Sequence, residues 1–599
     1  MKNLKEFIRI LDQRGLIAHI HKEVDSDQEL AEIHRRVIAA GGPALFFHKI
    51  KGSSFPVVSN LFGTQERIDL AFGQRPLQLM KDLVETAQTF FPPNSKKIFH
   101  AGKLIPKILK AGIKKKKVLF SSSYVNQNHL NPVDLTKLPF TKSWPEDGGS
   151  FLTLPLVYSE DPNGHGHNLG IYRMQRYDEN RLGMHWQIAK GSGFHYHESE
   201  KRNQSLPITV HLGGPPALLL AAVAPLPENV GELMLAGFLR GKRLPVSQLG
   251  SHSLPAVLDS EFALLGEVPP KERHPEGPFG DHYGYYSLKH DYPVFHCKEI
   301  WHAKDAVFPV TVVGKPRQED YFIGEYLQKL LSPIFPLVMP GVIDLWSYGE
   351  TGFHSLAVAV VKERYPREAM ASAFRVLGEG QLSLTKFLLV LDKKLDLKNF
   401  SMILEYVLER ADFSKDLFIF NHLSMDTLDY TGPEVNKGSK GILLGMGDPV
   451  RKILGEFRGE LASGIKIAKP FCKGCLVVEG NSYEKEKDLA KEISIHKAFQ
   501  DWPLIILVDS IDKALSSSTS FLWTTFTRFE PAGDIYAKSE IIKRHHIHYE
   551  PPIVIDSRIK PNYPKELFCS EEIKEKVNKR WNEYFPKGMA MGSSDYGNL

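Results

Sequence analysis

A glycine- and proline-rich segment from Pro275 to Tyr286 carries two acidic side chains in a setting suited to chemistry. Glu276 and Asp281 lie five positions apart, among three glycines and two prolines that restrict the backbone to few paths. Both carboxylates can therefore project into one cavity. Neighbouring carboxylates push each other's pKa values apart, so we expect one to keep a proton near neutral pH. Such a pair suits general acid catalysis, and a glycine-rich turn with solvated acids is the simpler alternative.

A carboxamide and a guanidinium lie further upstream, in a strand-like stretch. Asn168 and Arg173 are five positions apart. Side chains alternate along a strand, so the two project to opposite faces unless a bulge or bend intervenes. The planar fork of Arg173 suits a carboxylate, and the amide oxygen of Asn168 suits a hard cation. Taken alone, the stretch is also explained by an asparagine turn beside a surface arginine.

A third set of side chains has the types that bind metals. Glu232 follows a short proline-containing segment, and on its own it is explained equally well as an exposed acid at a helix start. Imidazole ligates metals readily, and one Asn, one His and one Glu together suit Mn2+ or Mg2+. The histidines that crowd this part of the chain are His165, His167, His185, His195 and His197.

The order of expected elements divides the chain into four regions. Residues 1–120 mix helices and short strands, and Leu4, Phe7, Ile8 and Leu11 mark one face of an opening amphipathic helix. Residues 121–310 show short strands punctuated by turn residues, which indicates a β-rich barrel. Strands and helices alternate over 311–450 and again over 451–599, which is typical of α/β layers. The chain is too long for a single hydrophobic core.

The two C-terminal regions share a weak internal repeat. A strand ending in Asp, a helix with Arg and a second strand beginning after Asp occur twice in the same order. The residues are Asp392, Arg410 and Asp416, then Asp509, Arg528 and Asp534. The order predicts a partial duplication, although two ordinary βαβ units also share such a pattern.

Composition excludes several classes of protein. The net charge of +5 is small beside 75 Lys+Arg and 70 Asp+Glu, so we expect no nucleic-acid partner. No apolar run is long enough to span a membrane, and charges interrupt the start of the chain, which argues against a signal peptide. We therefore expect a cytoplasmic protein. Four cysteines make no disulfide framework, and Cys472 and Cys475 lack a second pair for a zinc site.

Taken together, these motifs resemble those of the UbiD family of prenylated-FMN-dependent decarboxylases. The matching segments are Asn168–Arg173 (NLGIYR), Gly183–Trp186 (GMHW), Leu235–Gly241 and Pro275–Asp281 (PEGPFGD), together with the opening helix. The resemblance covers most of residues 1–450. It implies an N-terminal α/β domain, a central flavin-reductase-like split β-barrel and a C-terminal α/β domain. The chain is longer at its C-terminus by about one domain of ~100 residues.

The resemblance also implies a cofactor and a site. Arg173, Glu276 and Asp281 match the family's catalytic set, in which Asp281 stands where some members have Glu. Asn168 and Glu232 match ligands of Mn2+ (or Mg2+), with His185 as the best match for the third. Lys386 matches a lysine that reaches the cofactor phosphate. The complete cofactor-binding set is Asn168, Ile171, Tyr172, Arg173, Gln187, Glu232 and Lys386, and a K+ site near backbone positions 222–225 is implied as well.

The implied roles agree with elementary chemistry. Loss of CO2 from an sp2 carbon requires an electron sink, which prenylated FMN would supply. Arg173 would pair with Glu276 and hold the substrate carboxylate, and Glu276 would deliver a proton to the carbon that lost CO2. Asp281 would tune that transfer or contact the substrate. A UbiX-type flavin prenyltransferase would supply the cofactor, and a homo-oligomer is implied.

The expected function is decarboxylation of an aromatic hydroxy acid in quinone biosynthesis. The candidate substrates are a polyprenyl-hydroxybenzoate for ubiquinone and a dihydroxynaphthoate for menaquinone, and a lipid-tailed substrate would bring the enzyme to the surface of the inner membrane. Three alternatives remain open. They are a decarboxylase or carboxylase of another small aromatic or unsaturated acid, an FMN-dependent oxidoreductase, and a non-catalytic scaffold. Paired acids favour proton transfer over hydride transfer.

Overall fold

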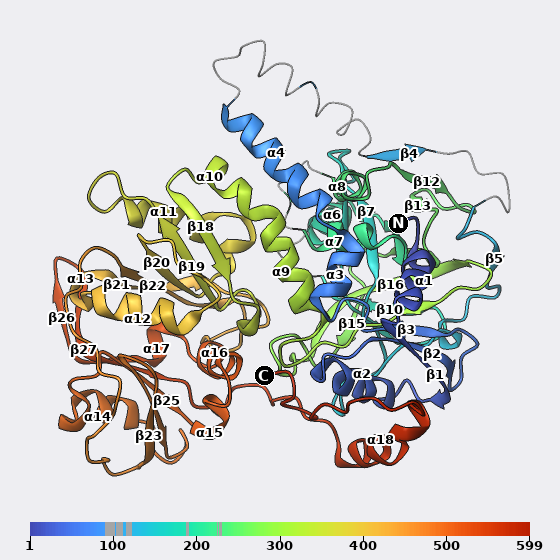
Figure 1. Ribbon diagram of the computed structural model, residues 1–599. Coiled ribbons are helices and arrows are strands. Elements are labelled where there is room, and N and C mark those ends of the chain that lie inside the picture. The colour runs from blue at the N-terminus through green and yellow to red at the C-terminus, as the bar shows by residue number, and fades with distance from the viewer. Residues whose placement is uncertain (90–101, 103–111, 116–122, 187–190, 225, 227–230) are drawn as a thin grey trace. The chain divides into compact units, whose positions relative to one another are not determined.

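A computed structural model of the protein describes residues 1–89, 102, 112–115, 123–186, 191–224, 226 and 231–599 (Figure 1). The chain forms two compact units. Unit one consists of residues 1–330 and 566–598, and unit two consists of residues 331–565 with the terminal Leu599. The regions 1–120 and 121–310 thus lie in unit one, and the domain edges proposed inside each unit stay predictions. Within the described residues, no helix is both long and apolar enough to cross a bilayer.

Unit one begins with a helix and a small sheet. The opening helix α1 (Leu4–Gln13) buries Leu4, Phe7, Ile8 and Leu11, as the sequence predicted. The sheet has the order β1-β2-β3-β17, and α2 is the helix that connects β1 to β2. The bounds are β1 (Ile17–Val24), α2 (Glu29–Ala39), β2 (Ala44–Ile50), β3 (Val57–Ser59) and β17 (Phe308–Pro309); the next helices are α3 (Gln65–Phe72) and α4 (Arg75–Thr89).

The centre of unit one is a ten-stranded sheet that curls into a half-barrel, as the split-barrel prediction required. Its main path runs β6-β9-β10-β16-β14-β11-β7-β8, and β5 and β15 pair with β16. The bounds are β5 (Asn128–His129), β6 (Phe151–Leu152), β7 (Leu156–Glu160), β8 (His167–Ile171), β9 (Met174–Arg176), β10 (Arg181–Met184), β11 (Leu206–Leu212), β14 (Phe262–Val268), β15 (Arg273–Glu276) and β16 (His290–His302).

Helices and a three-stranded sheet accompany the half-barrel. The order of the small sheet is β13-β12-β4. The bounds are β4 (Ile113–Lys115), β12 (Leu244–Gln248), β13 (Pro255–Val257), α6 (Gly191–Lys201), α7 (Pro216–Val223), α8 (Glu232–Arg240) and α9 (Glu319–Leu331). The apolar α7 is buried from Pro216 to Ala221 and packs against α8 and β8, which fixes the start of α8 close to that strand.

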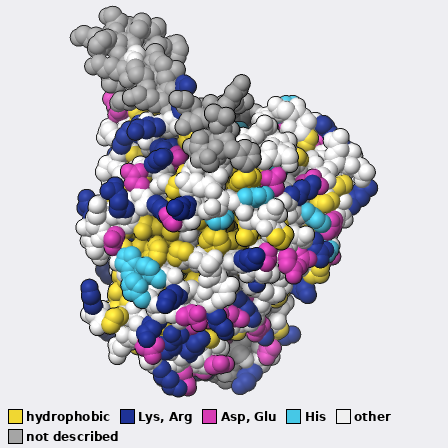
Figure 2. Space-filling view, turned by 90° about the vertical axis from the view of Figure 1, so that its right-hand side faces the viewer, with side chains coloured by type: hydrophobic (Ala, Val, Ile, Leu, Met, Phe, Trp, Pro, Cys, Tyr) yellow, Lys and Arg dark blue, Asp and Glu magenta, His cyan; other side chains and the backbone are white. Residues whose placement is uncertain are grey.

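A group of histidines lies on the outer surface of β1 and β2. His19 Nδ1 lies 2.9 Å from His48 Nε2, and the rings of His21 and His48 stack with centroids 4.2 Å apart. Figure 2 shows a compact histidine patch beside an apolar area on this side of the molecule. Burial and the neighbouring imidazoles of His21 and His19 lower the pKa of His48.

Unit two contains two five-stranded sheets with the same strand order. The first runs β18-β19-β20-β22-β21 and the second runs β23-β24-β25-β27-β26. In each, the first and last pairs are antiparallel and the two central pairs are parallel. This identity of topology confirms the predicted duplication.

The first sheet comprises β18 (Val342–Ser347), β19 (Leu356–Val361), β20 (Phe387–Leu391), β21 (Leu417–Ser424) and β22 (Lys437–Gly445), with α10 (Phe335–Val338), α11 (Glu368–Gly378), α12 (Phe400–Arg410) and α13 (Phe413–Asp416). The second comprises β23 (Ile465–Cys472), β24 (Cys475–Gly480), β25 (Leu504–Val508), β26 (Ile535–Lys543) and β27 (His546–Asp556), with α14 (Leu489–Ile495), α15 (Ile511–Ala514), α16 (Ser518–Phe526) and α17 (Pro531–Asp534). Cys472 and Cys475 are buried cross-strand neighbours on the β23–β24 hairpin, both with free thiols.

The end of the chain returns to unit one. Helix α18 (Glu571–Tyr584) packs against α2 and β1. The buried carboxylate of Glu29 on α2 receives an ion pair from Lys576 at 2.9 Å, a second from Arg580, and a hydrogen bond from the Tyr584 hydroxyl. Burial would raise the pKa of Glu29, but these partners lower it overall. The last residues are therefore part of the fold of the first unit.

Candidate active site

Arg173 lies at the centre of a buried charge cluster. Its Nε donates to Glu276 Oε1 at 2.8 Å and its Nη2 donates to Glu276 Oε2 at 3.1 Å. Its Nη1 forms an ion pair with Asp281, and Nη2 also donates to Ser287 Oγ at 2.9 Å. The guanidinium further lies over the ring of Phe279, 4.5 Å from its centroid. The structure thus brings together the three residues that the sequence singled out for catalysis.

The bend that the sequence left open lies directly before Arg173. Strand β8 ends at Ile171 and pairs with β7, whereas β9 begins at Met174 and pairs with β6 and β10. The chain therefore changes direction at Tyr172 and Arg173. This turn frees Asn168 and Arg173 from the alternation of one continuous strand, and each side chain meets its own set of partners.

Both acids of the cluster are held in their charged form. Burial would raise the pKa of Glu276, but Arg173 and then His185 lower it to about 2. Burial would likewise raise the pKa of Asp281, but His282 and Arg173 lower it to about 2. The expectation that one acid keeps a proton near neutral pH is therefore wrong for the protein alone. The guanidinium between the two carboxylates outweighs their mutual repulsion.

A carboxamide fixes the end of the strand that carries Glu276. Gln175 on β9 accepts a hydrogen bond from the Gly277 N–H at 2.8 Å and donates to the Gly148 carbonyl oxygen at 2.8 Å. Gly277 has φ of 91°, a conformation that strongly favours glycine. A Cβ on Gly148 would lie 2.2 Å from the carbonyl oxygen of Gly277. Only a glycine at position 148 allows the two backbones to approach this closely.

A buried aspartate holds the far side of the same loop. Asp147 Oδ2 accepts hydrogen bonds from the N–H groups of Ser143 and Trp144, both at 2.9 Å. Its Oδ1 accepts from the Gly280 N–H at 2.7 Å, directly before Asp281. Burial raises the pKa of Asp147 to about 7 against these three donors. Sequence reasoning missed Asp147 and Gln175, and the one local signal near them is the Gly148-Gly149 pair.

His185 lies against Glu276. Its Nδ1 is 3.1 Å from Glu276 Oε2, and its ring packs on Tyr292 with centroids 4.4 Å apart. Burial and the charge of Arg173 lower its pKa, so the ring is neutral and Nδ1 is the donor to the carboxylate. Its Nε2 is buried and has no hydrogen-bond partner among the described residues. The role of His185 as a metal ligand stays a prediction.

Asn168 lies on β8, and Glu232 bonds the backbone of the same strand. Asn168 Nδ2 donates to Tyr172 Oη at 3.1 Å and to Ser192 Oγ at 2.8 Å, which leaves its carbonyl oxygen available as a ligand. The Leu169 N–H donates to Glu232 Oε2 at 3.1 Å. Burial raises the pKa of Glu232, so a cation beside it would be stabilising. These donors fit a hard cation such as Mn2+ or Mg2+.

Asn168 and Glu232 do not make a complete set of metal ligands by themselves. Among the residues that the structure describes, no three side chains of His, Cys, Asp or Glu surround one metal position. Asn168 and Glu232 therefore supply part of a set. Ile171 ends β8 and is half-buried, Tyr172 is buried, and Gln187 lies outside the described residues.

Lys386 lies in unit two, directly before β20, as the sequence predicted. Its Nζ is 2.7 Å from Asp429 Oδ2, and both side chains are buried. Nζ also donates to Thr431 Oγ1 at 3.4 Å. The ammonium of a lysine is suited to an anionic group.

Family models match three successive parts of this chain. They describe the N-terminal domain, the Rift-related domain and the C-terminal domain of 3-octaprenyl-4-hydroxybenzoate carboxy-lyase, and they match residues 8–87, 116–316 and 321–445. The three matches together cover more than half of the chain. The C-terminal match ends with the first sheet of unit two.

Relatives resemble the chain over almost its whole length. A protein of Chlamydia trachomatis without an assigned function is 49% identical over 98% of this chain and 100% of its own. A Chlamydia pneumoniae protein, named as a component of 4-hydroxybenzoate decarboxylase, is 48% identical over 98% of this chain and 99% of its own. An Archaeoglobus fulgidus protein is 34% identical over 73% of this chain and 90% of its own.

Solved structures share the fold. Vanillic acid decarboxylase of Sedimentibacter hydroxybenzoicus in its closed form has a TM-score of 0.65 at 22% identity, covering 82% of this chain and 99% of that chain. The UbiD-class enzyme HmfF of Pelotomaculum thermopropionicum, in complex with FMN, has a TM-score of 0.62 at 21% identity, covering 77% of this chain and 98% of that chain. At such identities the likeness establishes the fold alone.

Proposed function

The chain belongs to the UbiD family of carboxy-lyases, and from that premise we propose that it removes CO2 from an aromatic acid without oxidation. One observation supports this proposal above the others. A buried guanidinium is held between two carboxylates, one at the end of a strand and one on a glycine-rich loop. Arg173 can bind a substrate carboxylate, and Glu276 can then receive and deliver a proton.

The proton chemistry follows from the charges around Glu276. Its pKa of about 2 depends first on Arg173, because burial alone would raise it. A substrate carboxylate that pairs with Arg173 weakens the ion pair between Arg173 and Glu276 and adds a negative charge nearby. Glu276 then takes up a proton. The protonated acid lies beside the substrate carboxylate that has replaced it as the partner of Arg173. Transfer of this proton to the carbon that has lost CO2 completes the exchange. Neutral His185 keeps Glu276 Oε2 in place through its Nδ1–H.

The chain's side chains also fit the cofactor that the family uses. When bound, prenylated FMN supplies the electron sink that decarboxylation at an sp2 carbon requires. We propose that Asn168 and Glu232 hold a Mn2+ or Mg2+ ion for its phosphate, with His185 as the sequence-based candidate for a third ligand. Ile171, Tyr172 and Gln187 are the other proposed cofactor contacts in unit one, and contact of Lys386 with the cofactor phosphate stays a prediction from the sequence. A UbiX-type prenyltransferase would supply the flavin, and a K+ site near positions 222–225 stays a prediction.

The proposed substrate is a hydroxylated benzoic acid or a close relative of one. The matching family is named for a polyprenylated 4-hydroxybenzoate, and a relative at 48% identity is named for 4-hydroxybenzoate. The specific proposals are a polyprenyl-hydroxybenzoate and a dihydroxynaphthoate, which would place the enzyme in quinone biosynthesis. A panel of such acids, with and without prenyl tails, separates these proposals from turnover of another small aromatic or unsaturated acid.

The decisive experiment changes Glu276 alone. The full chain is co-expressed with a UbiX-type prenyltransferase, and its flavin spectrum, metal content and CO2 release are measured. We expect Glu276→Gln to lower turnover by a factor of about 100 or more while the flavin stays bound, because a positioned acid contributes about 10² to 10⁴ to such rates.

The control for this experiment is Glu272→Gln, in the same segment. Glu272 is bound to His296 at 2.9 Å and makes no contact with Arg173. We expect this variant to retain wild-type turnover. Undiminished CO2 release by Glu276→Gln would remove Glu276 from the mechanism, and flavin-dependent NAD(P)H oxidation without CO2 release would favour an oxidoreductase.

A further inference from the structure

The two sheets of unit two are copies that match position by position. Leu356 pairs with Phe387 in the first sheet, as Cys475 pairs with Leu504 in the second. In the next strand pair of the first copy, the Gly441 N–H donates to the Lys386 carbonyl oxygen at 2.9 Å. In the second copy, the Ile553 N–H donates to the Pro503 carbonyl oxygen at 3.0 Å. The backbone register is thus the same in both copies.

The aspartates of the sequence repeat make the same bonds in each copy. The Gly447 N–H donates to Asp392 Oδ2 at 2.8 Å, and the Ile559 N–H donates to Asp509 Oδ2 at 2.8 Å. In the first copy, the N–H of Asp412, the cap of α13, donates to Asp416 Oδ2 at 2.9 Å. In the second copy, the N–H of Glu530, the cap of α17, donates to Asp534 Oδ2 at 2.7 Å. Such agreement indicates common descent of the two copies.

The copies contact each other reciprocally. Helix α13 of the first copy packs on β27 of the second, and its equivalent α17 packs on β22, the equivalent of β27. Helices α12, α16 and α17 are drawn between the two sheets in Figure 1. A contact in which each partner offers the same surface to the other is the isologous contact of a symmetric dimer. Here both partners belong to one chain.

Equivalent apolar side chains meet in the interior between the copies. One core cluster includes Phe387, Leu389 and Leu417 of the first copy together with their equivalents Leu504, Ile506 and Ile535. The remaining cavity that they line has a volume of about 30 Å³, roughly the space of one water molecule. Apolar packing of this density is typical of permanent interfaces. A polar seam adds to it, since Ser439 Oγ bonds the Glu530 carboxylate and accepts from the Ala532 N–H at 2.8 Å.

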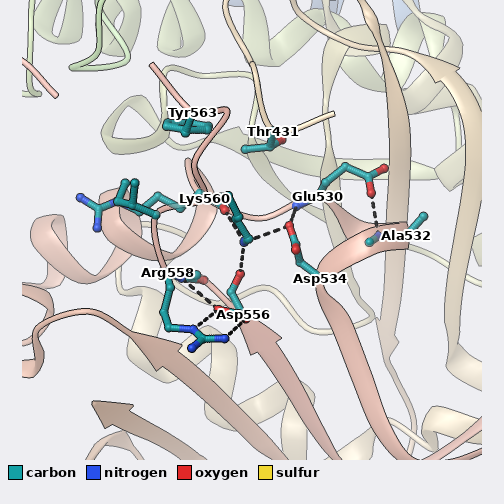
Figure 3. Close-up of polar contacts among 12 residues, drawn as sticks. Thr431, Glu530, Ala532, Asp534, Asp556, Arg558, Lys560 and Tyr563 are labelled. Carbon is teal, nitrogen blue, oxygen red and sulfur yellow. Dashed lines mark hydrogen bonds and ion pairs between the residues drawn. The ribbon is translucent and has the colours of Figure 1, made fainter. Parts of the chain in front are cut away.

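The second copy has the same strand order as the first but different charged side chains. Pro503 stands at the position of Lys386, so the second copy offers no ammonium there. After β27 it instead supplies Arg558 and Lys560. Figure 3 shows Lys560 bound to Asp534, at 3.1 Å, and to the backbone of Asp556, at 2.6 Å. Arg558 and Asp556 form a fully buried ion pair. These charged side chains pair with one another and stabilise the fold of the second copy.

We propose that the second copy covers the surface of the first copy to which, in a symmetric dimer, a second chain would bind. The family's C-terminal model ends at residue 445, and the solved structures match 98% or more of their own length with 77–82% of this chain. The second copy lies outside the residues that the family models match. Because its own duplicate covers this face, no second chain can pair there, and we expect a monomer. The resemblance implied a homo-oligomer instead, and this inference does not depend on the proposed decarboxylation.

The mass of the full chain in solution tests the proposal. Light scattering after gel filtration, over roughly 1 to 50 µM, is expected to give the 67.7 kDa of one chain at every concentration. A stable dimer or larger assembly would overturn it.

A matched pair of variants tests the seam between the copies. Glu530 and Asp412 are equivalent helix caps, and Glu530 alone reaches across to the other copy. We expect Glu530→Ala to increase hydrogen exchange in β22 at least tenfold and Asp412→Ala to leave that strand unchanged. Equal exchange of β22 in wild type and Glu530→Ala would show that the seam does not hold the copies together.

Discussion

Acid should destabilise unit one through a buried histidine on the half-barrel. His211 on β11 is 1% exposed and has both ring nitrogens engaged. Its Nδ1 lies 3.2 Å from the Leu156 carbonyl oxygen and must donate, whereas its Nε2 accepts from the Val257 N–H at 3.0 Å. Only the neutral tautomer with the proton on Nδ1 satisfies both bonds. Burial lowers the pKa of His211 from 6.5 to about 4, and the bond to Leu156 opposes this shift weakly.

The size and sign of the effect follow from this shift in pKa. The unfolded chain binds a proton at His211 below pH 6.5, and the folded chain does so only near pH 4. Stability is therefore complete above pH 6.5 and falls as the pH decreases through this window. The loss is about 2 kcal/mol at pH 5 and about 3 kcal/mol well below pH 4, because one pKa unit corresponds to ~1.4 kcal/mol.

The assay is urea denaturation at pH 7 and pH 5, followed by hydrogen exchange of the β11 segment. We expect His211→Gln to remove about 2 kcal/mol of the difference between the two pH values, because Gln offers a donor and an acceptor but does not titrate. His197→Gln, at an exposed position of α6, is the control and should leave the difference unchanged. His34, whose pKa burial lowers to about 3, adds its own acid sensitivity to all three proteins. An identical difference in wild type and His211→Gln would refute the reasoning.

Three further substitutions test the loop and the second copy. Gly148→Ala places a Cβ 2.2 Å from the Gly277 carbonyl oxygen, so CO2 release should fall at least about tenfold; wild-type turnover would contradict the close approach. Asp147→Asn keeps the size but replaces one of the two acceptor oxygens by an NH2 donor, so turnover should fall while the flavin spectrum persists; loss of flavin as well would indicate a wider role. Arg558→Ala leaves Asp556 buried and unpaired, so urea denaturation should show a loss of about 3–5 kcal/mol, and a loss under 1 kcal/mol would contradict burial of this pair.

The sequence allowed the main features of the catalytic cluster to be predicted. Glu276 and Asp281 could be recognised because glycine and proline restrict the loop between them. Arg173 could be recognised from its place in a motif that resembles a family. The family and the fold that it implies are confirmed by the family models and the solved structures. The order of Asp392, Arg410 and their counterparts also predicted the duplication.

Other parts of the site could not be predicted, because they depend on contacts between distant segments. Asp147 meets Gly280 across more than a hundred residues, and no local pattern marks an aspartate that will accept three backbone N–H groups. The charge state of the acid pair was predicted wrongly for the same reason. Two neighbouring acids predict repulsion, and only the fold shows that the guanidinium of Arg173 lies between them.

The return of the last residues to unit one has a consequence for how the protein is made. Glu29 leaves the ribosome more than 500 residues before its partners Lys576, Arg580 and Tyr584. Unit one must therefore wait for α18 to be made before this carboxylate gains its cationic partners and the Tyr584 hydroxyl. A chain cut short near residue 565 would release a complete second unit attached to a first unit that lacks its final helix. Early termination of translation would therefore damage unit one, which contains residues 1–330.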